Sequence, residues 1–471
     1  MTDATSEDGR GSTRDPASFR DPSGFVFRRD EMLFRQVNAG FGERWDDFTG
    51  SGFLGRLQSR GILVSHEIVP IHEALDPSTA HAVLRPEVVD FISYPYEWSF
   101  GQLKDAAILT LGAQALAIDA GFTLRDATAY NVQFRRGRPV LIDTLSFERA
   151  RPDQPWIAYR QFCEQFLAPL ALMAYRDVRC GLMLRDHLDG IPLDFAATLL
   201  PGRTRLNPGL GAHIHAHASA QRRYESNATA TSGRAVVRMS PFKQAALIDS
   251  LRRTIESLRW DPTGTEWADY ADHTSYSADA ASSKEDVVRA MLESSGGATV
   301  WDLGANTGRF SRIAASLGAR VVAWDIDPAA TENHYRMLQS DGATTTLPLL
   351  GDVAQPSPSL GWALEERLSM FERADADVVM ALALVHHLAI GRNIPLGHIA
   401  STFAALAPEL IIEFIPRGDP MVERLLATRE DVFHEYTIDG FRAAFSQRYR
   451  IAEEAPIRGS GRLMFRMERL K

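Results

Sequence analysis

The stretch Thr299-Val-Trp-Asp-Leu-Gly-Ala-Asn-Thr-Gly-Arg-Phe-Ser-Arg-Ile313 decides the fold of the C-terminal part of this chain. An apolar run typical of a buried strand leads into a glycine turn, and the turn leads directly into a helix. Gly304 and Gly308 let the backbone turn sharply and let a ligand approach amide groups, because glycine has no Cβ. Asn306 stands where a dinucleotide-binding loop has its middle glycine, and the carboxylate of Asp302 would repel a pyrophosphate. The stretch therefore predicts a Rossmann-type turn that suits a ligand other than a dinucleotide.

Apolar strands alternate with helices after this turn, which predicts a doubly wound parallel sheet covered on both faces. The predicted strands are 299–303, 320–324, 346–350, 377–382 and 409–414. Asp325 and Asp327 end the second strand, where a carboxylate can accept both hydroxyls of a ribose. Asp352 follows the third strand, where a carboxylate can accept the exocyclic amine of adenine. The strand ends therefore predict a nucleoside site at one edge of the sheet.

The motif order D-x-G-x-x-x-G, then D, then G-D, resembles the class I S-adenosylmethionine-dependent methyltransferases over residues 284–471. This resemblance implies that S-adenosylmethionine is the cofactor. It also implies that the methionine, ribose and adenine parts of the cofactor lie against Gly304, Asp325 and Asp352. The candidate cofactor residues in this domain are Asp302, Gly304, Asn306, Gly308, Asp325, Asp327 and Asp352.

Three further segments, 266–276, 411–421 and 428–436, resemble methyltransferases among the nodulation proteins of rhizobia. Two aromatic residues in the first segment, Tyr270 and Tyr276, are candidates for contact with the sulfonium cation, because an aromatic face attracts a cation. Packing of a lid or linker helix is the alternative use of these two rings.

Methyl transfer from a sulfonium needs alignment of the acceptor atom, the methyl carbon and the sulfur, and an oxygen acceptor also needs a base. His386 and His387, at the end of the fourth strand, are the candidate bases, and Glu413, at the end of the fifth, is another. Lining of the acceptor pocket is the alternative role of the histidines. The Asn/Asp-Pro-Pro-Tyr signature of many amine methyltransferases is absent, which argues against DNA or glutamine as the acceptor. We expect methylation of an oxygen or nitrogen of a small molecule or glycan.

The N-terminal half carries a second pattern, between Leu124 and Asp143. Asp126, Asn131 five positions later, and Asp143 after a predicted hairpin resemble the catalytic segment of protein-kinase-like and aminoglycoside-phosphotransferase-like folds. The resemblance implies an α+β, kinase-like domain. Departures from the pattern are a leucine in place of the H-R-D histidine, a D-T-L triplet in place of D-F-G, and the absence of a convincing glycine-rich loop or strand lysine. Phosphoryl transfer and a non-catalytic module that recruits a partner are therefore both alternatives for this half.

Composition shifts divide the chain into four parts. We expect a disordered tail over 1–24, the α+β kinase-like domain over 25–225, a linker and helix over 226–283, and the methyltransferase domain over 284–471. His213, His215 and His217 would share one face only on a strand, and no cysteine or carboxylate completes a set, so we assign no metal site.

The overall composition limits the class of protein. The chain has 471 residues, two cysteines and a formal net charge of -9, which fits a multidomain protein of a reducing cytoplasm and argues against nucleic acid as a partner. The longest apolar run, 166–175, is half of a membrane span of about 20 residues and contains a proline, so we expect no membrane segment. No motif indicates an oligomeric state.

Overall fold

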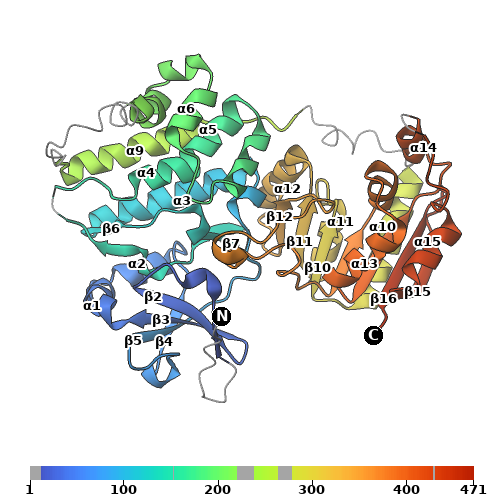
Figure 1. Ribbon diagram of the computed structural model, residues 1–471, viewed down its shortest axis with the longest axis horizontal. Coiled ribbons are helices and arrows are strands. Elements are labelled where there is room, and N and C mark those ends of the chain that lie inside the picture. Colours follow the sequence, from blue (N-terminus) through green and yellow to red (C-terminus); the bar gives the residue numbers. More distant parts are fainter. Residues whose placement is uncertain (1–11, 152, 220–237, 264–277, 428–429) are drawn as a thin grey trace. The chain divides into compact units, whose positions relative to one another are not determined.

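The structure is a computed structural model that describes residues 12–151, 153–219, 238–263, 278–427 and 430–471. Contacts divide the chain into two compact units (Figure 1). The first unit runs to Tyr96, continues from Phe100 to Trp260 and includes Ser359–Arg367. The second unit consists of Glu97–Ser99, Asp261–Pro358 and Leu368–Lys471.

The first unit begins with a five-stranded antiparallel sheet in the order β1-β2-β3-β5-β4. Its strands are β1 (Ser12–Arg14), β2 (Gly24–Arg29), β3 (Met32–Asn38), β4 (His66–Val69) and β5 (Ala80–Pro86). Apolar side chains of β2 and β3, among them Phe27 and Phe34, are buried against one another, as strand alternation requires. The predicted tail 1–24 is too long, because β1 pairs with β2 and a 3-10 turn follows at Pro16–Ser18.

Helices make up most of the rest of the first unit, together with two short two-stranded sheets. The helices are α1 (Gly42–Gly50), α2 (Phe53–Ser59), α3 (Phe100–Asp119), α4 (Tyr159–Phe162), α5 (Ala168–Tyr175), α6 (Leu193–Leu199), α7 (Pro208–Leu210) and α9 (Pro241–Ser257). One small sheet pairs β6 (Phe122–Leu124) with β9 (Phe147–Arg149), and the other is a hairpin of β7 (Val132–Arg135) and β8 (Arg138–Leu141). A sheet followed by segregated helices confirms the α+β class predicted for this half.

One domain boundary expected from the sequence differs in the structure. The helix α9 packs along α3 and belongs to the first unit, whose middle segment ends at Trp260, so residues 238–260 of the predicted linker and helix at 226–283 lie in the first unit. Residues 159–185 form α4, a π-helical turn at Cys163–Leu167, α5 and a 3-10 segment at Val178–Arg185 instead of one continuous helix. Pro169 lacks the amide that would continue a regular α-helical ladder through the π turn.

The second unit contains a seven-stranded sheet in the order β12-β11-β10-β13-β14-β16-β15. Its first five strands are parallel: β10 (Thr299–Leu303), β11 (Arg320–Asp325), β12 (Thr346–Leu350), β13 (Val378–Ala381) and β14 (Glu409–Phe414). These match the five strands predicted from the sequence. The antiparallel strands β15 (Tyr449–Pro456) and β16 (Leu463–Arg469) extend the sheet beyond β14 and were not predicted.

Helices cover both faces of this sheet. The helices are α10 (Ala278–Ser295), α11 (Arg309–Ser316), α12 (Pro328–Asp341), α13 (Leu396–Leu406), α14 (Pro420–Leu426) and α15 (Ile438–Phe445). One core cluster joins α10 and α11 to Ile411 of β14. Phe441 of α15 packs against Phe414, which lies three residues after Ile411 along β14 and therefore on the opposite face. The doubly wound, Rossmann-like class predicted for the C-terminal domain is thus confirmed.

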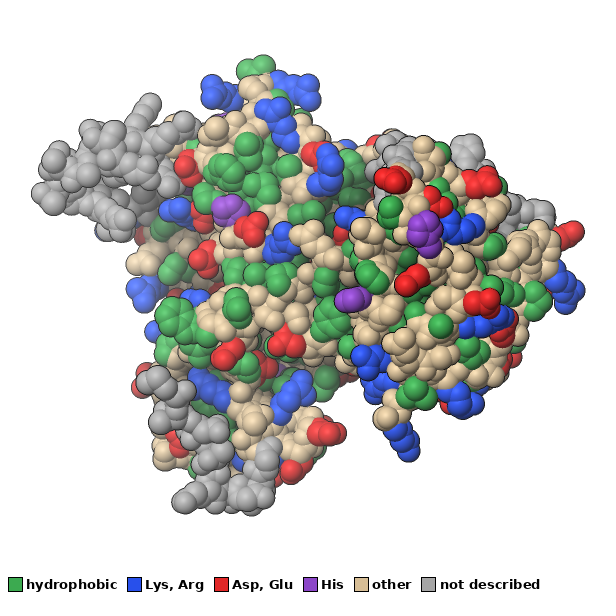
Figure 2. All heavy atoms as spheres, turned by 45° about the vertical axis from the view of Figure 1, so that its right-hand side comes forward, with side chains coloured by type: hydrophobic (Ala, Val, Ile, Leu, Met, Phe, Trp, Pro, Cys, Tyr) green, Lys and Arg blue, Asp and Glu red, His purple; other side chains and the backbone are tan. Residues whose placement is uncertain are grey.

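The surface carries charges of both signs, as the numbers of basic and acidic residues predict. Basic and acidic side chains are interspersed on the face shown in Figure 2. Across the described parts of the chain, every helix is too short or too polar to cross a membrane.

The placement of α9 in the first unit gives a first prediction. Leu251 is fully buried, whereas Phe242 in the same helix is 83% exposed. We expect Leu251→Ala to lower the free energy of unfolding of the first unit by about 2–5 kcal/mol, because it removes buried apolar contacts and leaves a cavity. Phe242→Ala is the matched control and should change it by less than about 0.5 kcal/mol. Denaturant unfolding measures both, and equal effects of the two variants would contradict the packing of α9.

Candidate functional site

The candidate site lies at the carboxyl edge of the parallel strands of the second unit. The strand order reverses between β10 and β13, because the chain proceeds from β10 to β11 and β12 in one direction and to β13 and β14 in the other. Ligands of open α/β sheets bind in the crevice outside such a reversal. The glycine turn after β10 and the histidines after β13 stand on its two sides.

The glycine turn adopts the backbone that its sequence predicts. Gly304 has a φ of +77°, and its amide donates a hydrogen bond of 2.8 Å to the carbonyl oxygen of Trp324. A Cβ on Gly304 would lie in ordinary contact, 3.5 Å from Leu384 in the turn after β13. A Cβ on Gly308, which also has a positive φ of +77°, would lie 2.0 Å from Nε2 of His334. Gly304 therefore faces the crevice, whereas Gly308 is required for packing of α11 against α12.

Asp325 joins the glycine turn to the end of β11. Its Oδ2 accepts a hydrogen bond of 2.7 Å from the amide of Asn306, and its Oδ1 accepts one of 2.8 Å from the amide of Asp327. An ionised carboxylate has about four acceptor positions, so positions for two further donors remain. Burial raises the pKa of Asp325 to about 6, although the two amide bonds oppose this shift. The carboxylate is therefore ionised at neutral pH and protonated in mild acid.

Asp302 and Asp327 hold the backbone around the site. Asp302 is buried under the turn, where Oδ2 accepts a hydrogen bond of 2.6 Å from Ser311 of α11, and burial raises its pKa to about 6. Asp327 caps α12, because Oδ1 accepts the amides of Ala329 at 2.8 Å and Ala330 at 3.4 Å. Asp302 and Asp327 therefore support the backbone around the glycine turn. Asp325 is the acid that contacts the glycine turn directly.

Asp352 lies after β12, as expected, but it has a cationic partner. Its Oδ2 is 3.0 Å from Nη2 of Arg392, and its Oδ1 accepts the amide of Ala354 at 2.9 Å. Gly351 before it allows close packing, since a Cβ there would lie 2.6 Å from the ring of Trp324. The carboxylate is partly exposed and remains reachable by a donor from solvent.

The two histidines follow β13 with their rings in contact, at a centroid distance of 4.0 Å. His386 is fully buried, and neither of its ring nitrogens has a hydrogen-bond partner within the described residues. Burial holds the pKa of His386 well below the usual value for histidine, and burial lowers that of His387 to about 4. Both rings are therefore uncharged at neutral pH, as a proton acceptor must be.

Glu413 is placed differently from a general base. It is fully buried, with Nζ of Lys284 at 2.7 Å from Oε2 and Nη1 of Arg462 at 3.3 Å from Oε1. A carboxylate held between two cations is a poor proton acceptor, because both charges stabilise its ionised form. These two ion pairs therefore do not favour Glu413 as a general base.

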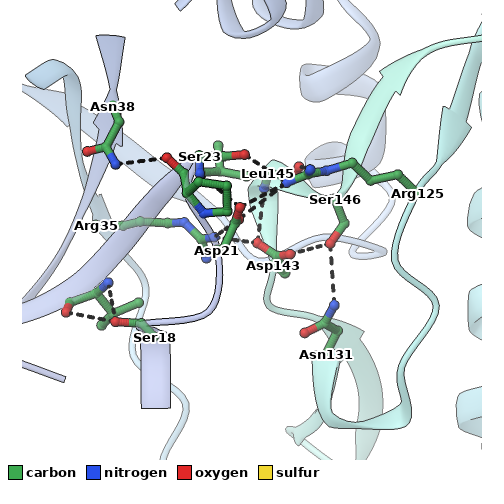
Figure 3. Close-up of polar contacts among 12 residues, drawn as sticks. Ser18, Asp21, Ser23, Arg35, Asn38, Arg125, Asn131, Asp143, Leu145 and Ser146 are labelled. Atoms are coloured by element: carbon green, nitrogen blue, oxygen red, sulfur yellow. Dashed lines mark hydrogen bonds and ion pairs between the residues drawn. The ribbon is translucent and has the colours of Figure 1, made fainter. Parts of the chain in front are cut away.

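The first unit brings the kinase-like residues together in a charged cluster (Figure 3). Asp143, directly after the β7–β8 hairpin, has Oδ1 at 2.6 Å from Nη2 of Arg35 on β3. Ser146 donates to its other oxygen. Burial alone would raise the pKa of Asp143, but Arg35 and the hydrogen bonds outweigh it and lower this pKa. Asn131 donates to Oγ of Ser146 at 3.3 Å.

A second acid reinforces the cluster from the segment between β1 and β2. Asp21 lies with Oδ1 at 3.2 Å from Nη2 of Arg125 and with Oδ2 at 3.8 Å from Nη2 of Arg35 (Figure 3). In a protein kinase a glycine-rich loop between the first two strands covers the phosphates. A carboxylate in this segment would repel them.

The third kinase-like residue, Asp126, is bonded to a neutral side chain. Its Oδ1 accepts a hydrogen bond of 2.7 Å from Nε2 of Gln161, and burial together with the nearby charge of Asp143 raises the pKa of Asp126.

Two further groups of residues were singled out in the sequence. Tyr270 and Tyr276 lie outside the described residues. The histidines near residue 215 are helical and bond to hydroxyls: His213 lies 2.8 Å from Oη of Tyr159, and His215 lies 2.8 Å from Oγ1 of Thr204.

The sequence did not predict the ion pairs of either unit. Lys284, Arg392 and Arg462 pair with acids at the site, and Arg35 and Arg125 pair with acids in the first unit. Lys284 and Glu413 are 129 positions apart, so no local pattern joins them. The available signal was the acid itself: a charged acid buried near a strand end needs a buried cation as its partner.

The fold and site define a class: a chain with an α+β unit followed by a Rossmann-like domain with a glycine turn and strand-end acids. The chain also has a curated relative, the nodulation protein NoeA of Rhizobium meliloti (strain 1021), with 37% identity over 460 residues that cover 96% of this chain and 95% of NoeA. The chain therefore belongs to the NoeA family. No protein-family model matches it.

Three solved structures overlap parts of the chain. The bifunctional kinase-methyltransferase WbdD aligns at 16% identity and a TM-score of 0.31 over 44% of this chain and 43% of WbdD, so the chain matches less than half of that protein. The magnesium protoporphyrin IX methyltransferase ChlM of Synechocystis PCC 6803 with bound SAH aligns at 20% identity and a TM-score of 0.31, over 41% of this chain and 84% of ChlM. The N-methyltransferase NodS of Bradyrhizobium japonicum WM9 aligns at 12% identity and a TM-score of 0.31, over 41% of this chain and 98% of NodS. Because these structures overlap the chain only in part, we assign the fold from the strand order. The site is assigned from its own geometry.

The cluster around Asp143 gives a prediction for the first unit. We expect millimolar Mg·ATP to leave the thermal midpoint of the full chain unchanged, because Arg35 already pairs with the carboxylate that would hold the metal, and only a ligand that binds the folded form raises the midpoint. Differential scanning fluorimetry measures the shift. A rise in the midpoint that Asp143→Asn abolishes would contradict the expectation.

Proposed function

We propose that this chain is an S-adenosylmethionine-dependent methyltransferase that acts on an oxygen or nitrogen of a small molecule or glycan. The arrangement of Asp325 carries the proposal: a buried carboxylate at the end of β11 is fixed to the glycine turn by two amide bonds and keeps acceptor positions for paired hydroxyls. A purely structural carboxylate would not need to stand beside an open glycine at the reversal of the sheet.

The residues present fit an adenosyl sulfonium. Asp325 would accept the ribose hydroxyls, Asp352 the adenine amine, and the open side of Gly304 would admit the methionine part. The acids Asp302 and Asp325 favour a cationic ligand, since their charges would oppose an anionic one. When bound, the cofactor supplies an electrophilic methyl group, and the protein contributes chiefly the alignment of the acceptor.

The acceptor side of the proposed site contains His386 and His387. An uncharged imidazole can accept a hydrogen bond and then a proton from an O–H or N–H acceptor. His386 is the stronger candidate, because a buried imidazole without a hydrogen-bond partner in the described chain is costly unless another group uses it. The finer assignment of the acceptor to a small molecule or glycan, and a cytoplasmic location, stay predictions.

The charges of the first unit do not favour phosphoryl transfer. Arg35 and Arg125 neutralise Asp143 and Asp21 where a kinase would hold metal and phosphate. We therefore propose a non-catalytic, kinase-like first unit that serves the methyltransferase by binding a partner or an acceptor.

Cofactor binding tests the proposal directly. Isothermal titration at pH 7 should show binding of S-adenosylmethionine by the full chain, and Asp325→Asn should weaken it by at least about tenfold, the value of a hydrogen bond to a charged group. Asp341→Asn, at the exposed end of α12, is the matched control and should bind as the wild type does.

The same titration should depend on pH. The pKa of Asp325 is about 6, so the acceptor carboxylate is lost as the pH falls through 6. We expect affinity to fall by about tenfold between pH 7 and pH 5 in the wild type and to stay level in Asp325→Asn. If affinity still depended on pH in Asp325→Asn, the dependence would belong to Asp302, whose pKa is also about 6. That result would count against the role of Asp325.

The acceptor half needs a second measurement. Transfer of a radiolabelled methyl group to fractionated cell extract should fall by about 10²–10⁴-fold in His386→Asn, because the asparagine cannot take a proton. Cofactor affinity measured by calorimetry should be kept in this variant. Equal transfer by His386→Asn and the wild type would exclude His386 as the base and leave His387 to be tested in the same way.

A further inference from the structure

A buried ion network lies directly behind the proposed reaction centre. Oε2 of Glu413 accepts hydrogen bonds from Nζ of Lys284 at 2.7 Å and from the amide of Ala383 at 2.8 Å. Arg462 lies 3.3 Å from Oε1 of Glu413 and donates through Nε to Oδ2 of Asp419 at 2.6 Å. The network therefore connects α10, β14, the turn after β13, the link before β16 and the N-cap of α14.

Stability is a weak reason for this network. Lys284 is 4% exposed, Arg462 2% and Glu413 0%, so all three charges have lost most of their water. Removing charges from water costs several kcal/mol each, and packed apolar residues often replace such groups without loss of stability. The hydrogen bonds that the network makes to the backbone therefore explain its presence better than stability does.

The backbone group that Glu413 holds belongs to a strained residue. Ala383 has a φ of +51°, in the left-handed region that residues with a Cβ avoid. Strain of this kind persists only where surrounding contacts determine it, and it is frequent at functional sites. Ala383 lies two residues after the last residue of β13 and three before His386, so its conformation sets the direction of the histidine segment.

The same turn forms one wall of the proposed cofactor crevice. Leu384, next to Ala383, is the neighbour that a Cβ on Gly304 would meet at 3.5 Å. On the other side of the network, Nζ of Lys284 lies 4.7 Å from the centroid of the Phe310 ring in α11, the helix that follows the glycine turn. The network thus contacts segments on both sides of the sheet reversal.

We propose that Glu413 is a positioning residue for the methyl-transfer reaction, held between Lys284 and Arg462 so that its carboxylate fixes the turn at Ala383 from which His386 and His387 extend. This inference deepens the proposed function and rests on it for the identity of the reaction. It replaces the general-base role expected for Glu413 with one that acts through the backbone.

Hydrogen exchange of the full chain tests the positioning role without a cofactor. Glu413→Gln keeps the size of the side chain but loses the charge that Lys284 and Arg462 require. We expect the segment 382–391 to exchange at least about tenfold faster in this variant, because a hydrogen bond to a charged group is lost. Segments of the first unit should exchange as in the wild type. Glu409→Gln is the matched control, since Glu409 is in the same strand, pairs with Arg466 at 3.1 Å and lies at the opposite end of β14.

Activity measurements separate positioning from general structure. Glu413→Gln should lower methyl transfer to extract at saturating cofactor by about 10²-fold, the scale of a misplaced reacting group. Its cofactor affinity should change less than that of Asp325→Asn. If Glu413→Gln does not fold, Glu413→Asp keeps the charge but withdraws the oxygens by one methylene, and the same local increase in exchange is expected.

The outcomes are distinct. Unchanged exchange over 382–391, or an equal increase throughout the second unit, would overturn the positioning role even if the wild type binds and transfers as proposed. A wild type that does not bind S-adenosylmethionine would overturn the proposed function, while local exchange in Glu413→Gln would still show whether Glu413 holds the turn.

Discussion

The two backbone amides that Asp325 accepts are the interaction on which the proposed site depends. They connect the glycine turn after β10 to the end of β11, and they hold a carboxylate at the point where the sheet order reverses. The carboxylate is buried, so it needs these donors to remain ionised at neutral pH. Its neighbours Asp302 and Asp327 serve the same arrangement, one by holding α11 and the other by capping α12.

A second layer of charge supports the other side of the reversal. There the buried Glu413 holds the turn that leads to His386, much as Asp325 holds the glycine turn. Both acids act on backbone amides, so the positions of the reacting groups depend on the backbone more than on surface loops. Methyl transfer depends on alignment of the reacting atoms, and a backbone held in this way keeps the surrounding residues in place. In the first unit, Asp143 and Asp21 pair with the arginines Arg35 and Arg125.

Residues with local signals were predictable from the sequence. The strands β10 to β14, the glycine turn and the strand-end acids follow from apolar runs, glycine spacing and sheet topology, all of which act over a few residues. The role of Glu413 could not be predicted, since its partners Lys284 and Arg462 are distant in sequence. The same is true of Arg35, whose strand gives no sign that it pairs with Asp143. The strands β15 and β16 were missed because charged residues interrupt their apolar positions, whereas the buried parallel strands are nearly continuous apolar runs.

The central claim is that the carboxyl edge of the second sheet cradles an adenosyl sulfonium. Hydrogen exchange with and without S-adenosylmethionine tests it most directly, because it locates the contact on the chain. The account predicts slower exchange over 303–308 and 325–330, together with the segment around Asp352, and unchanged exchange in the first unit. Protection confined to the first unit, or absent from both glycine turn and strand ends at saturating cofactor, would contradict it.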